Sequence, residues 1–240
     1  MTKQDFEFVA HTIGETEQSQ TAILKLTDDI EATTELLHHD SLFPQIISSA
    51  SMMTVSPWFY FYEMVYHALK LKHLEDDDLV DYVSSVCVDF SQSDVLWHFA
   101  SASGEKMIYI VDMLQVMKDL KEVQQYYMHQ YIGNVSLFLI GFFPDLIYQR
   151  NKRKGAPSFE YYENVGQSEF EAAAQSSLLY EADASPVLFK LAEYFTDVRS
   201  AINVYVDSYL SLHNRKSVLE RIDRQSATLD EESFRELVKL

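Results

Sequence analysis

Three pairs of side chains in this 240-residue chain set a carboxylate and an imidazole about one helical turn apart. On a helix each pair would lie on one face, the arrangement that metal sites in helical bundles use. The pairs, in chain order, are Glu35 and His38, Glu63 and His67, and Asp94 and His98. Only the first is a Glu-x-x-His pair, whereas a carboxylate-bridged di-iron bundle needs two such pairs and two further glutamates. The spacing alone therefore does not predict a complete di-iron site.

The two wider pairs resemble the ligand spacing of haem-oxygenase-like di-iron proteins. They leave open, as an alternative function, a helical-bundle enzyme or sensor that holds a metal or a small molecule in its interior. Its site would be drawn from Glu63, His67, Asp94, His98, Asp112 and His129. Short pairs of this kind also arise by chance as surface or half-buried hydrogen-bonded contacts, and no surrounding motif supports them. We therefore predict no cofactor.

The densest basic cluster of the chain follows a long apolar run that Pro144 interrupts. The segment 133–154, GNVSLFLIGFFPDLIYQRNKRK, ends in this cluster, which consists of Arg150, Lys152, Arg153 and Lys154. The residues that follow can line the same surface, namely Tyr161, Tyr162 and Glu163.

Three interpretations of the basic cluster remain open. In the first, it binds a phosphate, an acidic partner or a nucleic-acid backbone. In the second, its cations complement the dipole at a helix C-terminus and stay solvated. In the third, it contacts the acidic run 75–81, either within the chain or in a homodimer.

The charge balance limits the classes of partner. With 37 acidic against 19 basic residues, the formal net charge is -18. Nucleic acids and anionic membranes are both bound through Lys and Arg, so neither is an expected partner. No phosphate loop, dinucleotide-binding fingerprint, nucleophile elbow or His-Glu-x-x-His motif occurs. The apolar runs are shorter than the roughly 20 residues that span a bilayer, and we expect a cytoplasmic protein whose one cysteine, Cys87, is buried.

The composition indicates an all-α fold. Glycine and proline together number only 11, too few for the turns of a β-barrel or sandwich. We predict an irregular multi-helix bundle of about seven to nine helices. A flexible N-terminal segment is expected over residues 1–20, a single helical-bundle domain over 21–210, and a helical C-terminal tail over 211–240.

Local signals predict several helix ends. The pairs Ser56-Pro57 and Ser185-Pro186 each suit an N-cap followed by the first helical residue, and Ser158 is a further predicted N-cap. Residues 133–143 are expected to form a central buried helix. Two of its residues lack a side chain and would let a neighbouring helix approach closely, Gly133 and Gly141.

The segment after Pro186 has the most regular apolar spacing in the chain. Its apolar residues recur every three or four positions, which predicts one long helix, and they are Leu188, Leu191, Phe195, Val198, Ile202, Tyr205 and Tyr209. A polar stripe lies beside them, formed by Arg199, Asn203 and Asp207. We expect this stripe to fix the register of packed helices through a buried Arg–Asp pair, with a ligand cleft as the alternative.

Three segments are similar to a family of bacterial all-helical proteins of unknown function: SPWFYFYEMVYHALK, GNVSLFLIGFFPDLI and KGAPSFEYYENVG. The family pattern, Gly-x-x-x-Leu-Phe-x-x-Gly-x-Phe-Pro before an arginine-rich turn and a Tyr-Tyr-Glu helix, matches Gly133, Leu137, Phe138, Gly141, Phe143, Pro144, Arg150, Tyr161, Tyr162 and Glu163. The resemblance covers most of residues 50–210. It implies a bacterial, cytosolic, single-domain helical protein and carries over no activity.

The function that these observations favour is a non-enzymatic interaction or regulatory protein. It would act on a protein partner or as a homodimer. The expected contact surface is the basic cluster after Pro144 with the residues around Tyr161.

Overall fold

The computed structural model of this chain describes residues 1–48, 55–91, 110–154, 156–179 and 185–207. These ranges contain twelve helices and no strand. The all-α class predicted from the sequence is therefore confirmed, whereas the number of helices is higher than the predicted seven to nine.

The helices fall into two runs along the chain. The first six are α1 (Lys3–Ile13), α2 (Glu17–Ile23), α3 (Ile30–Leu37), α4 (Leu42–Ser48), α5 (Pro57–Lys70) and α6 (Asp77–Ser91). The next six are α7 (Ile110–Met117), α8 (Glu122–Phe142), α9 (Pro144–Lys154), α10 (Phe159–Leu179), α11 (Ser185–Glu193) and α12 (Phe195–Tyr205). Four of them, α2, α3, α4 and α7, have only seven or eight residues. Helices of this length span about two turns, too few for an apolar period to reveal them in the sequence.

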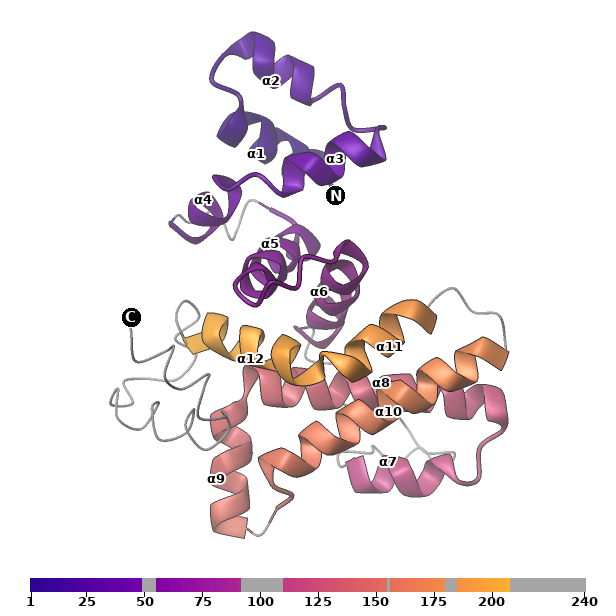
Figure 1. Cartoon of the computed structure of the whole chain (residues 1–240). Helices are drawn as coiled ribbons and strands as arrows, with labels where there is room; N and C mark the ends of the chain where they lie inside the picture. Colours follow the sequence, from indigo (N-terminus) through magenta and orange to yellow (C-terminus); the bar gives the residue numbers. More distant parts are fainter. Residues whose placement is uncertain (49–54, 92–109, 155, 180–184, 208–240) are drawn as a thin grey trace.

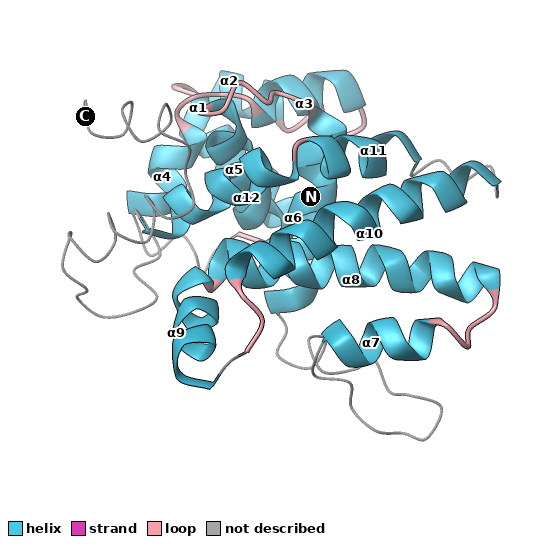
Figure 2. Ribbon diagram, turned by 60° about the horizontal axis from the view of Figure 1, so that its bottom comes forward, coloured by secondary structure: helices cyan, strands magenta, loops and turns pink. Residues whose placement is uncertain are grey.

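The two runs occupy opposite ends of the molecule (Figure 1). Helices α1 to α4 lie over α5 and α6 at one end, while α8 and α10 cross each other at the other end. Helices α11 and α12 return between these groups, and α12 packs against both α5 and α8. Figure 2 shows α7 alongside α8 and shows α9 turned away from it.

Residues 1–20, for which the sequence predicts a flexible segment, contain α1 and part of α2 in the structure. Asp5 is fully buried and accepts a hydrogen bond from the Thr2 backbone N–H at 2.6 Å. The same carboxylate accepts the Ser56 backbone N–H at 2.7 Å and the Ser56 hydroxyl at 2.8 Å. A contact across 51 residues thus ties α1 to the start of α5.

Two close helix contacts depend on residues without a side chain. A Cβ atom at Gly133 of α8 would lie 2.8 Å from the ring of Phe170 on α10, and one at Gly141 would lie 3.1 Å from Ile202 on α12. The packing agrees with the close approach predicted for both positions. The tightest contact was not predicted: a Cβ atom at Gly166 of α10 would lie 2.3 Å from the ring of Phe195.

The apolar seam after Pro186 is buried, but it belongs to two helices. Leu188, Leu191, Phe195, Val198, Ile202 and Tyr205 are all at most 3% exposed. The predicted single helix is wrong, because α11 ends at Glu193 and α12 begins at Phe195, with a bend at Tyr194 between them. A three- and four-residue spacing continues through such a bend, so the apolar pattern could not reveal it. Tyr209 and the tail predicted over 211–240 lie outside the described residues.

Candidate functional site

The chain turns sharply where α8 meets α9. Pro144 has no backbone N–H, so the helix cannot supply the donor that the Ile140 carbonyl would receive from residue 144. The backbone of Phe143 leaves the helical region at φ -125° and ψ 44°. Within the described residues no single helix meets the length and hydropathy needed to cross a bilayer; α8 and α9 do so only jointly, and they are bent by 91°.

A side chain from α12 satisfies the carbonyl groups that remain at the end of α8. The Asn203 Nδ2 group donates to the Ile140 carbonyl at 2.8 Å and to the Gly141 carbonyl at 2.5 Å. Asn203 is buried. Because buried carbonyl groups without a donor are costly, this amide acts as a C-terminal cap supplied by another helix.

Arg199, one turn before Asn203, fixes the orientation of that amide. Its Nη1 donates to Asn203 Oδ1 at 3.2 Å, and its Nη2 donates to Glu163 Oε1 on α10 at 3.0 Å. The guanidinium lies 4.9 Å from the ring centre of Phe159, also on α10. Because only 2% of the residue is exposed, these contacts replace the water that would otherwise solvate the Arg199 charge.

This network changes the role expected for Glu163. The sequence predicts Glu163 on a partner-binding surface and Asp207 as the acid that pairs with Arg199. In the structure Glu163 pairs with Arg199. The link joins α10 to α12 across 36 residues, and no local spacing announces it. The sequence signal for this pair was Arg199 itself. A buried guanidinium requires an acidic partner, which any part of the fold can supply.

Local contacts hold the turn between α9 and α10. The Asn151 side-chain amide donates to the Ala156 carbonyl at 2.7 Å. The Ser158 hydroxyl accepts the Tyr161 backbone N–H at 3.2 Å, which confirms the predicted N-cap. Tyr161 and Tyr162 meet edge to face at 5.8 Å between ring centres. Tyr162 is buried and Tyr161 is half-buried, so these two rings support the turn more than they face solvent.

Helix α9 presents apolar and basic residues together. Ile147 is buried and attaches the helix to the body, whereas Leu146 is 44% and Tyr148 is 41% exposed. Lys152 is exposed, and its Nζ lies 4.5 Å from the centre of the Tyr148 ring. Arg150 is half-buried, and Arg153 and Lys154 complete the last turn of α9. We call this set of residues the α9 surface: Leu146, Tyr148, Arg150, Lys152, Arg153 and Lys154.

Four of the six residues proposed for the alternative metal site lie in the described part of the chain. Glu63 and His67 both lie on α5. Glu63 is 2% exposed and its Oε1 has no hydrogen-bond partner among the described residues. Burial raises the pKa of Glu63 well above its usual value. His67 stacks on Phe43 at 3.7 Å between ring centres, and burial lowers its pKa.

The other candidate ligands lie on different helices. His129 of α8 pairs with Glu169 of α10 at 2.6 Å, and Asp112 is exposed on α7. Asp94 and His98 lie outside the described residues. In the part of the chain that the structure describes, no three His, Cys, Asp or Glu side chains are placed to hold a metal ion.

His38, from the remaining carboxylate–His pair, stacks on Tyr66 instead of pairing with Glu35. The two ring centres are 4.4 Å apart. Its Nε2 lies 3.0 Å from Asp77 Oδ1, but the geometry is outside that of a hydrogen bond.

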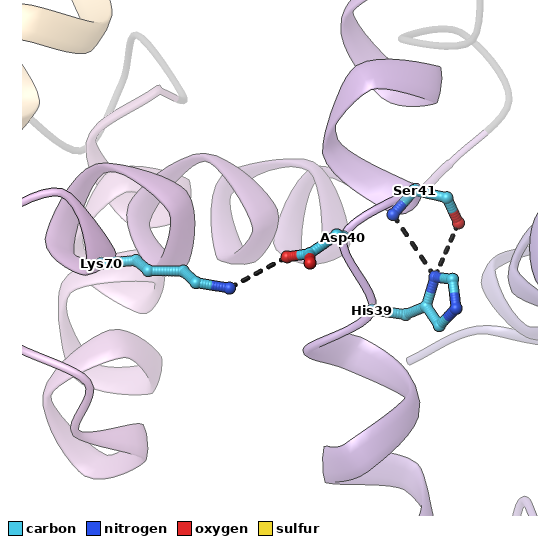
Figure 3. A network of polar contacts seen from close by, with 4 residues as sticks. All are labelled: His39, Asp40, Ser41 and Lys70. Carbon is cyan, nitrogen blue, oxygen red and sulfur yellow. Dashed lines mark hydrogen bonds and ion pairs between the residues drawn. The ribbon is translucent and has the colours of Figure 1, made fainter.

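Figure 3 shows a polar cluster around His39, in the link between α3 and α4. The His39 Nδ1 atom lies 2.7 Å from the Ser41 hydroxyl, which is the contact that a nucleophilic serine makes with its base. The adjacent carboxylate does not orient this imidazole, because Asp40 forms an ion pair with Lys70 at 2.9 Å. Both His39 and Asp40 are exposed. The cluster joins α5 to the link between α3 and α4, and no described residue supplies the third group that an activated serine needs.

Comparison with known proteins gives no further assignment. No family model, curated protein or solved structure matches this chain significantly. The family resemblance noted in the sequence stays a prediction.

Proposed function

We propose that this chain is a non-enzymatic interaction protein that binds an acidic partner through the α9 surface. The observation that carries the proposal is the placement of α9. The helix leaves α8 at 91° and exposes two large apolar side chains beside the densest basic cluster of a chain with a net charge of -18.

The composition of the α9 surface suits a protein contact. Exposed apolar residues that lie together mark interaction sites, and Leu146 and Tyr148 supply that part. Basic side chains around an apolar centre favour an acidic partner and accelerate its approach. Because the chain as a whole carries an excess of acids, its field opposes the approach of an acidic partner, and the basic cluster offsets this repulsion locally.

The buried network supports the same proposal. Arg199, Glu163 and Asn203 hold the junction of α8, α10 and α12, from which α9 extends. A rigid junction presents the surface in one orientation, so little conformational entropy is lost on binding.

A bacterial, cytoplasmic setting belongs to the same proposal and is supported by the sequence resemblance. The charge balance supports a protein partner over a nucleic acid.

The experiment compares full-length variants in a quantitative pull-down from the lysate of the source cells. One variant replaces Arg150, Lys152, Arg153 and Lys154 by serine, and a second carries Leu146→Ser and Tyr148→Ser. The matched control removes four exposed lysines elsewhere: Lys3→Ser, Lys25→Ser, Lys118→Ser and Lys121→Ser.

At least one protein should be retained by the wild type and the control and be reduced more than tenfold on both α9 variants. Melting temperatures of the variants and the wild type should agree within a few degrees, because none of the replaced side chains that the structure describes belongs to the buried core. The proposal fails if every protein retained by the wild type is retained equally by the α9 variants.

A further inference from the structure

A cleft of about 460 Å³ lies where α1 and α3 meet α5 and α6. One wall is aromatic: Trp58 and Tyr62, successive residues on one face of α5, have ring centres 4.9 Å apart. Ile30 stands at the edge with 84% of its surface exposed. Trp58 is half-buried and Ile30 is exposed, so these two side chains give the cleft an apolar contact area, whereas Tyr62 is buried with 4% of the residue exposed.

The part of the cleft next to Trp58 is acidic. Asp77, Asp78 and Asp81 come from the first turns of α6, and all three are exposed. Trp58 Nε1 donates to Asp81 Oδ1 at 3.2 Å, so an acid lies directly at the edge of the aromatic wall. Among the described residues no Lys, Arg or His side chain lines the cleft. Beyond its lining, Lys190 Nζ lies 3.7 Å from Asp78 Oδ2 and His38 Nε2 lies 3.0 Å from Asp77 Oδ1.

A cleft with an aromatic and an acidic lining favours a ligand that carries a cationic group next to an apolar group. An ammonium or guanidinium group gains from the exposed part of the Trp58 ring and from the carboxylates beside it. An anion would gain from neither. Burial raises the pKa of Tyr62, and the negative charges of Asp77, Glu63 and Asp81 raise it further.

The α9 surface has the complementary features. It joins Leu146 and Tyr148 to a basic final turn, whereas the cleft joins an apolar wall to an acidic one. One turn of helix with a diameter of about 10 Å and a pitch of about 5.4 Å fills about 420 Å³. The cleft therefore has room for one helical turn, such as the basic end of α9.

The two surfaces of one molecule lie far apart. In Figures 1 and 2, α9 extends from α8 on the side away from α3 and α5. We infer that the cleft receives the basic end of α9 from a second copy of the chain. This inference rests on the proposed function of the α9 surface and names its partner.

The contact joins different surfaces of the two copies. It is head-to-tail, so each copy in a pair keeps one unoccupied surface and further copies can add. The net charge opposes association over long distances, but at about 0.15 M salt charges beyond about 8 Å are largely screened. Attraction between groups in contact persists. A contact of one helical turn is small, so a dissociation constant in the range of about 10–100 μM is expected.

The test is sedimentation equilibrium of full-length variants at about 0.15 M salt, from below to above that range of dissociation constants. The α9 variant replaces the four basic residues by serine, as above. The cleft variant carries Asp78→Lys and Asp81→Lys. Its control carries Glu17→Lys and Asp197→Lys, which reverse two exposed acids in the first turns of α2 and α12.

The average mass of the wild type and of the control should rise with protein concentration. Each of the two variants should keep the mass of a monomer over the same range, which corresponds to self-association at least tenfold weaker. An equimolar mixture of the two variants should form a 1:1 complex and stop there, because one retains its cleft and the other its α9 surface. A misfolded variant could not form this complex, so the mixture also controls for folding.

Three results would overturn the inference: a wild type that is monomeric throughout, self-association of either variant alone, or a mixture that forms no complex. The first result combined with loss of a cellular protein from the α9 variants would leave the proposed function standing. Complex formation without any such cellular protein would instead confine the α9 surface to self-association.

Discussion

At the scale of single residues, the carboxamide of Asn203 has the clearest structural role. It donates to two carbonyl oxygens of α8, at Ile140 and Gly141, and accepts from Arg199. The arginine contact fixes which side of the amide faces α8, since only the NH2 side can donate. The three contacts join α8 and α12 at the base of α9.

Replacing Asn203 by leucine should therefore lower the free energy of unfolding by about 2–4 kcal/mol, because two buried carbonyl groups lose their donor. Urea unfolding followed by circular dichroism measures the difference. Asn134, a half-buried amide of α8, accepts a hydrogen bond from the Tyr82 hydroxyl, and its replacement by leucine is the control, with an expected loss of about 1 kcal/mol. Equal losses at the two positions would contradict the capping role.

Glu63 links stability to pH through its burial. Desolvation raises its pKa well above the ordinary value, so the folded state holds this proton more tightly than the unfolded state does. The contribution of protonated Glu63 to the free energy of unfolding is intact below the pKa of the group in the unfolded chain, about 4.3. It is lost as the pH rises through the pKa in the folded state, at up to about 1.4 kcal/mol for each pH unit.

The Glu63→Gln variant should remove this dependence, since glutamine keeps the shape and cannot ionise. The difference in unfolding free energy, variant minus wild type, is expected to increase from pH 4 towards neutral pH. Parallel stability profiles for the two proteins would show that Glu63 ionises freely in the folded state. Urea unfolding at a series of pH values provides the measurement.

Residue chemistry was predictable where it is local. The spacing of Arg199 and Asn203 on one face was enough to expect a stripe that fixes helix packing, and the structure places both in such a network. The acid that completes it, Glu163, is not one turn away on the same helix. Partners brought together by the fold leave no trace in sequence spacing, which is also why the Asp5–Ser56 contact was not predicted.

At the scale of helices, boundaries followed local chemistry. The Ser56 hydroxyl accepts the Phe59 backbone N–H at 3.2 Å, and Pro57 begins α5, as the Ser-Pro pair predicted. Pro144 interrupts the apolar run in the sequence, and α8 ends just before it because proline has no backbone N–H to continue the helix. The bend at Tyr194 has no such signal, because neither Pro nor Gly occurs there and the apolar spacing continues across it.

Helix α10 can be tested through Gly166. Replacing a helical glycine by alanine normally gains about 1 kcal/mol of helix propensity. At Gly166 the added Cβ would lie 2.3 Å from the ring of Phe195, which is fully buried and cannot move aside. Overpacking should outweigh the gain, with a net loss of about 1–3 kcal/mol.

Gly141→Ala is the matched substitution, because its Cβ would lie 3.1 Å from Ile202, a contact that a shift of a few tenths of an ångström relieves. Thermal unfolding of both variants should rank Gly166→Ala well below Gly141→Ala. A Gly166→Ala protein as stable as the wild type would mean that α10 and α12 can separate at little cost.

At the scale of the whole molecule, the sequence does not predict which helices pack against one another. An amphipathic pattern indicates that a helix has a buried face, but it does not say which helix covers that face. Helix α12 lies between α5 and α8, and Lys190 of α11 pairs with Asp76 beside α6 across 114 residues. The basic α9 surface and the acidic cleft come to lie apart for the same reason, as a result of packing that no local rule determines.

The net charge of -18 should make the stability of the whole chain depend on salt. Self-repulsion opposes the compact state, and salt screens it, so the melting temperature is expected to rise by about 3–6 °C between about 0.02 and 0.5 M NaCl at pH 7.5. Ion pairs such as Lys190–Asp76 are weakened by salt, but surface pairs contribute little.

Near the isoelectric point of about 4.7 the repulsion vanishes, and the same increase in salt should leave the melting temperature unchanged or lower it. Differential scanning calorimetry at the two pH values separates this effect from the ionisation of Glu63, since each comparison is made at fixed pH. A melting temperature that falls with salt at pH 7.5 would mean that the attractive pairs outweigh the excess of acids, and that the fold depends on specific ion pairs more than on its apolar core.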